Sequence, residues 1–179
     1  MRNNSRLTKL VLMSLFIALE IILTRFCSIN TPTLRIGFGF LPIAMLGIMF
    51  GPIWAGAAYA IGDFLGMMIF PSGVYFPGFT ITALLTGAVF GVMLHKKKIT
   101  YVRVFFTSLI VCLILNLSLD TFWLYLMTGK GFLALLPARI LKVAFAIPIQ
   151  TILITVVWNK FLKKVATPII PYTTDISHK

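Results

Sequence analysis

Acidic side chains are scarce in this chain: Asp and Glu together number four among 179 residues. Three of them, Glu20, Asp63 and Asp120, come before the C-terminal tail. There is no DDxxD-type cluster for metal-dependent prenyl transfer, and no GxxxxGK motif for ATP hydrolysis. The two histidines, His95 and His178, lie in a basic stretch and in the tail, away from the acids. We therefore expect a protein with no catalytic residues, not an enzyme.

Cysteine is also rare, with Cys27 and Cys112 the only two in the chain. Neither belongs to a CxxC pair or lies near a histidine in the sequence. A disulfide framework or a metal site is therefore not expected. We predict no metal and no cofactor.

What the chain has in abundance is apolar side chains, which make up 59% of it, against 11% charged. Its mean hydropathy is +1.00, well above that of ordinary soluble domains. A membrane-spanning helix needs about 20 apolar residues. The length therefore allows at most about six or seven crossings, and we expect residues 1–179 to form a single transmembrane domain.

Hydropathy predicts six helices, near residues 8–25, 38–52, 53–70, 78–95, 102–127 and 137–162. The fold class is thus an all-α integral membrane protein, a six-helix bundle. The second segment is short, so we expect it to be irregular or to cross a locally thinned bilayer. The basic start resembles a signal peptide, but no small-residue cleavage site follows, and we interpret it as a retained first helix.

The basic residues, which give a net charge of +12, orient this bundle. Eleven of the 16 fall on the side of the N-terminus: Arg2, Arg6, Lys9, Lys96, Lys97, Lys98, Arg103, Lys160, Lys163, Lys164 and Lys179. The positive-inside rule therefore places both termini in the cytoplasm and explains the charge without a nucleic-acid partner. The remaining five lie at the outer side, where the rule predicts depletion: Arg25, Arg35, Lys130, Arg139 and Lys142.

Small residues recur at four-residue spacing, which lets helices approach closely in lipid. We expect the glycine pairs 47 and 51, 62 and 66, and 87 and 91 to serve packing within the bundle. Ser14 and Ala18 form a similar pair on the first helix. A contact with a partner protein is one interpretation of that pair.

Ionisable residues inside a membrane are functional candidates by default, because each costs about 2.5–3.5 kcal/mol on insertion scales. Glu20 lies five residues before Arg25, so these two could neutralise one another without a ligand. Asp63 is a further candidate.

Two helices carry polar stripes. Asn116, Asp120 and Trp123 share the spacing i, i+4, i+7, which predicts one face with an amide, a carboxylate and an indole. Arg139 and Lys142, with Gln150 beyond them, form the stripe of the last helix. The alternative to a ligand site is that Asp120 pairs with Arg139 or Lys142 across the helices.

The segment 70–79 holds four aromatic residues among prolines and glycines, including Phe76 and Phe79. It predicts either a cover over a site or an aromatic belt at the membrane interface. Arg25 and Arg35 flank the first outer loop, which could also cover a site.

This collection of side chains suits a flat heterocycle that bears carboxylates. The cations would bind the carboxylates, Trp123, Phe76 or Phe79 would stack on the ring, and Asp120 and Asn116 would bind its donor edge. Pterins fit this description, and so do several other vitamins.

The sequence resembles the membrane-embedded substrate-binding (S) components of energy-coupling factor (ECF) vitamin transporters, most closely the folate-specific ones. The resemblance covers nearly the whole chain. It rests on the order and spacing of these fragments: Leu19-Glu20-Ile21-Ile22-Leu23-Thr24-Arg25-Phe26, Leu34-Arg35-Ile36-Gly37-Phe38 with Leu41-Pro42, Gly62-Asp63-Phe64-Leu65-Gly66, Tyr75-Phe76-Pro77-Gly78-Phe79-Thr80 with Leu84-Leu85-Thr86-Gly87, Asn116-Leu117-Ser118-Leu119-Asp120-Thr121, and Pro137-Ala138-Arg139-Ile140-Leu141-Lys142.

The resemblance implies high-affinity folate binding at the outer face of a bacterial cell membrane. It also implies partners, namely a transmembrane coupling protein and two ATPase subunits, with toppling of the bundle delivering the vitamin inward. Members of that family dock through small residues spaced four apart on the first helix, which correspond here to Ser14 and Ala18. Serine replaces the usual first alanine.

Other functions remain as alternatives. The same architecture could bind another vitamin, such as thiamine or riboflavin, although those ligands make less use of so many cations. A non-transport membrane scaffolding protein would need neither the aromatic segment nor Arg139 and Lys142 at membrane depth. A proton-coupled carrier or a small membrane enzyme are further alternatives, but no inverted repeat supports the former.

Overall fold

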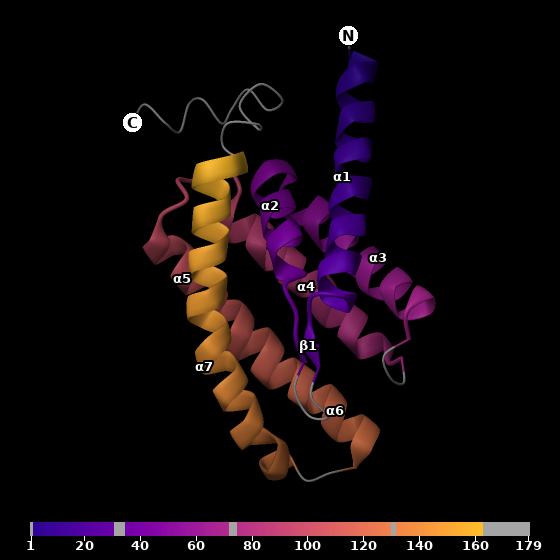
Figure 1. The fold of residues 1–179 in the computed structure, drawn as a ribbon, viewed down its shortest axis with the longest axis vertical. Coiled ribbons are helices and arrows are strands. Elements are labelled where there is room, and N and C mark those ends of the chain that lie inside the picture. The colour runs from indigo at the N-terminus through magenta and orange to yellow at the C-terminus, as the bar shows by residue number, and fades with distance from the viewer. Residues whose placement is uncertain (1, 31–34, 72–74, 130–131, 163–179) are drawn as a thin grey trace.

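A computed structural model describes residues 2–30, 35–71, 75–129 and 132–162, and these form a bundle of helices (Figure 1). In chain order the elements are α1 (Arg2–Arg25), β1 (Ile29–Asn30), β2 (Arg35–Ile36), α2 (Phe40–Phe50), α3 (Pro52–Ile69), α4 (Pro77–Leu94), α5 (Tyr101–Ile110), η1 (Val111–Leu119), α6 (Asp120–Thr128), α7 (Phe132–Val157) and η2 (Trp158–Leu162). The α5, η1 and α6 segments are continuous, as are α7 and η2, so the described chain contains the six predicted helices. The predicted all-helical fold is confirmed.

A short antiparallel ribbon of β1 and β2 follows α1, with Ile29 opposite Ile36 and Asn30 opposite Arg35. Hydropathy does not predict this ribbon. The turn between its strands, and the side chain of Arg35, lie outside the described residues.

Glycine and proline set several helix boundaries. Gly51 has a φ of 92°, in the left-handed region that favours glycine, and it turns the chain from α2 into α3. Pro52 and Pro77 begin α3 and α4, where a missing N–H leaves no helical hydrogen bond unmade. Gly129, with a φ of 63°, ends α6.

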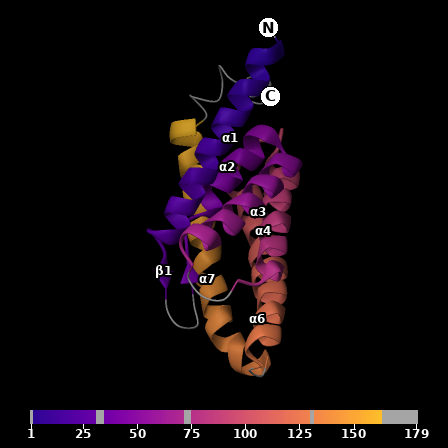
Figure 2. The ribbon, with the colours of Figure 1, turned by 90° about the vertical axis from the view of Figure 1, so that its right-hand side faces the viewer.

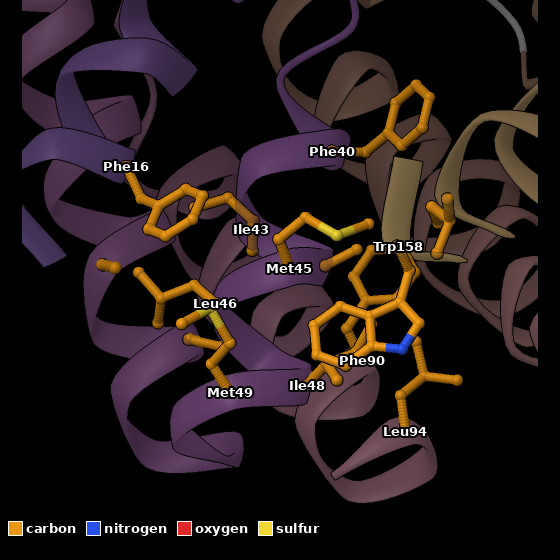
Figure 3. Packing of buried hydrophobic residues seen from close by; sticks show 14 of the residues in the cluster. Phe16, Phe40, Ile43, Met45, Leu46, Ile48, Met49, Phe90, Leu94 and Trp158 are labelled. Atoms are coloured by element: carbon orange, nitrogen blue, oxygen red, sulfur yellow. The ribbon is translucent and has the colours of Figure 1, made fainter. Parts of the chain in front are cut away.

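The second helix is short and almost entirely buried. α2 has 11 residues, nine of them buried, and it rises only about 16 Å. Phe16, Phe90 and Trp158 come from three other helices and belong to the same hydrophobic core (Figure 3). Short apolar helices of this length are typically core helices. α2 is therefore a regular helix packed within the bundle, and the expectation of irregular structure in this segment is wrong.

The other helices are long enough to cross a membrane. Five stretches meet the length and apolarity needed, at residues 7–25, 52–69, 77–94, 101–127 and 139–160. The chain is thus a multi-pass membrane protein by the composition of its helices.

Glycine pairs allow close packing between helices, as predicted. A Cβ on Gly47 of α2 would lie 3.0 Å from the backbone nitrogen of Gly91 on α4. Gly87 lies directly against the carbonyl of Ala55 on α3, and Gly91 directly against Pro52. Larger residues at these positions would force α2, α3 and α4 apart.

The two ends of the bundle differ. The start of α1 and the end of η2 lie at the same end, whereas the end of α6, the start of α7 and the strands β1 and β2 lie toward the other (Figures 1 and 2). Since the positive-inside rule predicts a cytoplasmic N-terminus, we call the second one the outer end. At the opposite end, Nδ1 of His95 lies 3.0 Å from the carbonyl oxygen of Ile48 and ties α4 to α2.

Candidate functional site

Aromatic rings gather toward the outer end, where α4 begins beside α6. We call Phe76, Phe79, Phe122 and Trp123 the aromatic cluster. The Trp123 ring centroid lies 5.6 Å from that of Phe76 and 5.2 Å from that of Phe122. Phe76 and Phe79 are 6.3 Å apart and meet edge to face. The structure thus brings together the three aromatic residues that the sequence singles out.

Asp63 of α3 is joined to the segment that leads into α4. Thr80 Oγ1 donates to Asp63 Oδ2 at 2.9 Å, and Tyr75 Oη lies 3.1 Å from the same hydroxyl. Because an ionised carboxylate can only accept, Thr80 must give its hydrogen to Asp63, and Tyr75 then donates to Thr80. The Tyr75 ring also packs edge to face on Phe64, 5.8 Å away. Asp63 therefore holds Tyr75 through Thr80.

Asp120 lies at the start of α6, within reach of charges from α7. Lys142 and Arg139 attract its carboxylate, and Asp63 repels it. It also interacts electrostatically with Thr82, whose hydroxyl accepts a hydrogen bond from Trp123. The two acids and the two α7 cations thus lie in one electrostatic neighbourhood. This attraction between Asp120 and the α7 cations is the alternative to a ligand site that the sequence also predicts.

Arg139 is buried and bonded to the helix that faces it. One terminal nitrogen donates to the backbone carbonyl of Asn116 at 3.1 Å and to the hydroxyl of Thr121 at 3.3 Å. These bonds leave other donors of the guanidinium for further interactions, since arginine carries five. Arg139 is therefore part of the α6–α7 interface as well as a candidate ligand contact.

The Asn116 amide contacts a side chain of its own helix. Its Nδ2 lies 3.9 Å from Cys112 Sγ, and that thiol lies 3.6 Å from Gln150 Oε1. Asn116 lies in η1, a stretch of π-helix in which hydrogen bonds run from i to i+5, whereas Asp120 and Trp123 lie in α6. The spacing i, i+4, i+7 therefore does not by itself put the three residues on one face.

Arg25 lies at the end of α1 and contacts α3. A Cβ on Gly66 would come within 3.1 Å of both its Nε and a terminal nitrogen. One turn earlier, Glu20 is 2% exposed, accepts a 2.8 Å hydrogen bond from Thr24 and lies against Gly62. The predicted glycine pair of α3 thus makes room for these two charged side chains of α1.

Three threonines belong to this site that the sequence does not single out, namely Thr80, Thr82 and Thr121. Threonine in a membrane helix usually bonds its own backbone carbonyl one turn back, as Thr121 does to Leu117. Spacing therefore gives no sign that these hydroxyls also bind side chains from other helices.

Ser14 and Ala18 lie on the exposed face of α1. Ser14 Oγ donates to the carbonyl of Leu10 at 2.9 Å. Its hydroxyl is therefore satisfied within the helix, and the position presents a small side chain to the surroundings. The neighbouring Leu15 is 62% exposed.

Comparison with known proteins gives a consistent picture. The family model described as "ECF transporter, substrate-specific component" matches residues 8–158. The folate transporter FolT of Clostridium novyi (strain NT) is 46% identical over 150 residues, which cover 84% of this chain and 87% of that protein. FolT of Leuconostoc mesenteroides subsp. mesenteroides is 31% identical over 146 residues, 78% of each chain.

A solved structure shares the fold. The crystal structure of FolT bound with folic acid superposes with a TM-score of 0.81 at 39% sequence identity, covering 85% of this chain and 93% of that one. The family resemblance read from the sequence is thereby confirmed. Its members are transporter components, so the scaffolding and enzyme alternatives are set aside. The chain belongs to the substrate-specific components of ECF transporters.

Proposed function

We propose that this protein is the membrane-embedded folate-binding subunit of an ECF importer in a bacterial cell membrane. The observation that carries the proposal is the 39% identity and 0.81 TM-score to FolT bound with folic acid. The 46% identity to a second folate transporter supports it. Thiamine or riboflavin as ligand is the alternative that binding experiments separate.

The chemistry of the outer end suits folate. The pterin ring is flat and would stack on Trp123 and Phe76, whose ring planes are inclined by 46°. The two carboxylates of its glutamate tail would bind cations, for which Lys142, Arg139 and Arg25 are the candidates. Arg35 and Phe79 remain proposed contacts of the same ligand.

Asp120 is the proposed acceptor for the donor edge of the pterin. Its carboxyl oxygens can accept hydrogen bonds from the N–H groups of the pterin. Asn116 is the weaker candidate for this role, because its amide is directed at Cys112. Asp63, occupied by Thr80, is expected to act indirectly.

Delivery to the cytoplasm needs energy that the chain does not supply itself. We propose that a transmembrane coupling protein and two ATPase subunits provide it, and that the bundle topples when docked on them. The exposed small residues Ser14 and Ala18 on α1 support a close helix–helix contact at that position.

Binding of radiolabelled folic acid to the purified protein in detergent tests the proposed ligand. Saturable binding that unlabelled folic acid displaces, and that excess thiamine and riboflavin do not, is the expected result. Displacement by thiamine or riboflavin at lower concentration than folic acid would assign the site to that vitamin instead. Lys142→Met is the variant to compare with the wild type in this assay, because it keeps the length of the side chain and removes its charge.

A further inference from the structure

The Trp123 indole packs against the first two turns of α4, where two residues determine its position. Gly78 and Thr82 are four residues apart and so lie on the same face of the helix. A Cβ on Gly78 would come within 2.5 Å of Trp123 Cδ2 and 2.6 Å of Phe76 Cε1. Only glycine leaves room for both rings at this point.

Thr82 binds the N–H group of the indole. It is 4% exposed, and the indole Nε1 donates to its hydroxyl at 3.1 Å. The indole N–H is a donor only, so Thr82 accepts this bond. Its own hydrogen is then directed to the carbonyl of Gly78, 3.2 Å away, or to Asp120, with which it also interacts.

The hydroxyl of Thr82 therefore links the indole of Trp123 on α6 to the backbone of α4 at Gly78. A hydrogen bond from an indole at one helix to a hydroxyl on another defines the rotation of the ring, which van der Waals contact alone does not. Valine has the shape of threonine but would leave this N–H without its acceptor.

We propose that Thr82, one turn after Gly78 on α4, is a positioning residue. It sets the plane of the Trp123 ring and thereby the preference of the site for a pterin ring. This inference rests on the proposed folate site. Thr82 need not touch the ligand. A ring held in its stacking orientation before the ligand arrives loses less conformational freedom on binding, and such pre-organisation raises affinity.

The first test examines the ligand-free protein by fluorine NMR after labelling with 5-fluorotryptophan. The chain has three tryptophans, so three resonances are expected, and Trp123→Phe identifies the relevant one. Thr82→Val should shift or broaden that resonance alone, and Thr82→Ser, which keeps the hydroxyl, should restore it. Thr86→Val is the matched control, since Thr86 is buried on the same helix one turn further on.

The second test measures affinity for two ligands, folic acid and p-aminobenzoylglutamate, which has the same acidic tail but no pterin. Thr82→Val should weaken folic acid binding by about tenfold at most, the range of an aromatic pair contact, and leave the affinity for p-aminobenzoylglutamate unchanged. Thr82→Ser should bind folic acid like the wild type.

The inference is overturned if Thr82→Val leaves the Trp123 resonance in place, or if it weakens both ligands equally, as a purely structural defect would. The proposed function fails separately, if the wild type does not bind folic acid. In that case the selectivity part of the inference fails with it, and the fluorine spectra still decide whether Thr82 orients the indole.

Discussion

The carboxylate of Glu20 on α1 lies directly against Gly62 on α3, in the space that a side chain at position 62 would fill. Thr24 donates to the same carboxylate, and one turn further on Arg25 lies against Gly66. The glycines of α3 thus determine how closely α1 can approach and where its arginine comes to lie. Since Arg25 is a proposed ligand contact, this contact between α1 and α3 also positions a residue of the proposed folate site.

Replacing Gly62 should therefore destabilise the bundle. We expect Gly62→Ala to lower the free energy of unfolding by about 1–3 kcal/mol, the usual cost of adding a methyl group to a packed contact. Thermal unfolding in detergent measures the change. The neighbouring Ile61, 43% exposed, offers the control Ile61→Ala, and equal stability of the two variants would show that Gly62 has room to spare.

The two α7 cations should separate ligand binding from stability. Lys142→Met is expected to weaken folate binding about 10–100-fold, the value of a hydrogen bond to a charged group, with an unchanged melting temperature. Arg139→Met should weaken binding and also lower the melting temperature, because Arg139 holds the Asn116 carbonyl and the Thr121 hydroxyl. Wild-type affinity in both variants would refute the anion site.

Asp63 should act through Thr80 and not on the ligand. We expect Asp63→Asn and Thr80→Val to weaken folate binding to a similar, modest extent, because each breaks the path from Asp63 to Tyr75. The double variant should then bind no more weakly than either single one, since effects within one hydrogen-bond network are not additive. Additive losses would instead indicate that Asp63 contacts the ligand by itself.

The exposed face of α1 should matter for transport alone. Ser14→Trp adds bulk where the proposed docking contact needs a small residue, so uptake into cells should be abolished while purified protein binds folate normally. Phe106→Trp on α5, a position that is 54% exposed, is the control and should transport normally. Undiminished uptake by Ser14→Trp would remove the docking assignment.

The number of helices and most of their limits could be predicted from hydropathy, because a membrane helix must be apolar over its whole length. The segment at 38–52 shows the limit of this signal. The sequence shows that this segment is apolar and short, and only the structure shows that it is a regular helix packed among Phe16, Phe90 and Trp158.

The sequence singles out the charged and aromatic residues of the candidate site, but not the hydrogen bonds that connect them. The common face predicted for Asn116 and Asp120 assumes a regular α-helix, whereas Asn116 lies in the π-helix η1. Nothing in the sequence marks that π-helix. Similarly, Thr80 and Thr82 are ordinary residues for a membrane helix, and their role depends on Asp63 and Trp123 arriving from other helices.

The most direct test of the account is quenching of intrinsic tryptophan fluorescence, titrated in parallel with folate, thiamine and riboflavin and corrected for ligand absorbance. Stacking of the ligand on Trp123 predicts saturable quenching by folate alone, strongly reduced in Trp123→Phe although Trp54 and Trp158 remain. Saturable quenching by thiamine or riboflavin without any by folate, or no response to any of the three, would contradict the proposed function.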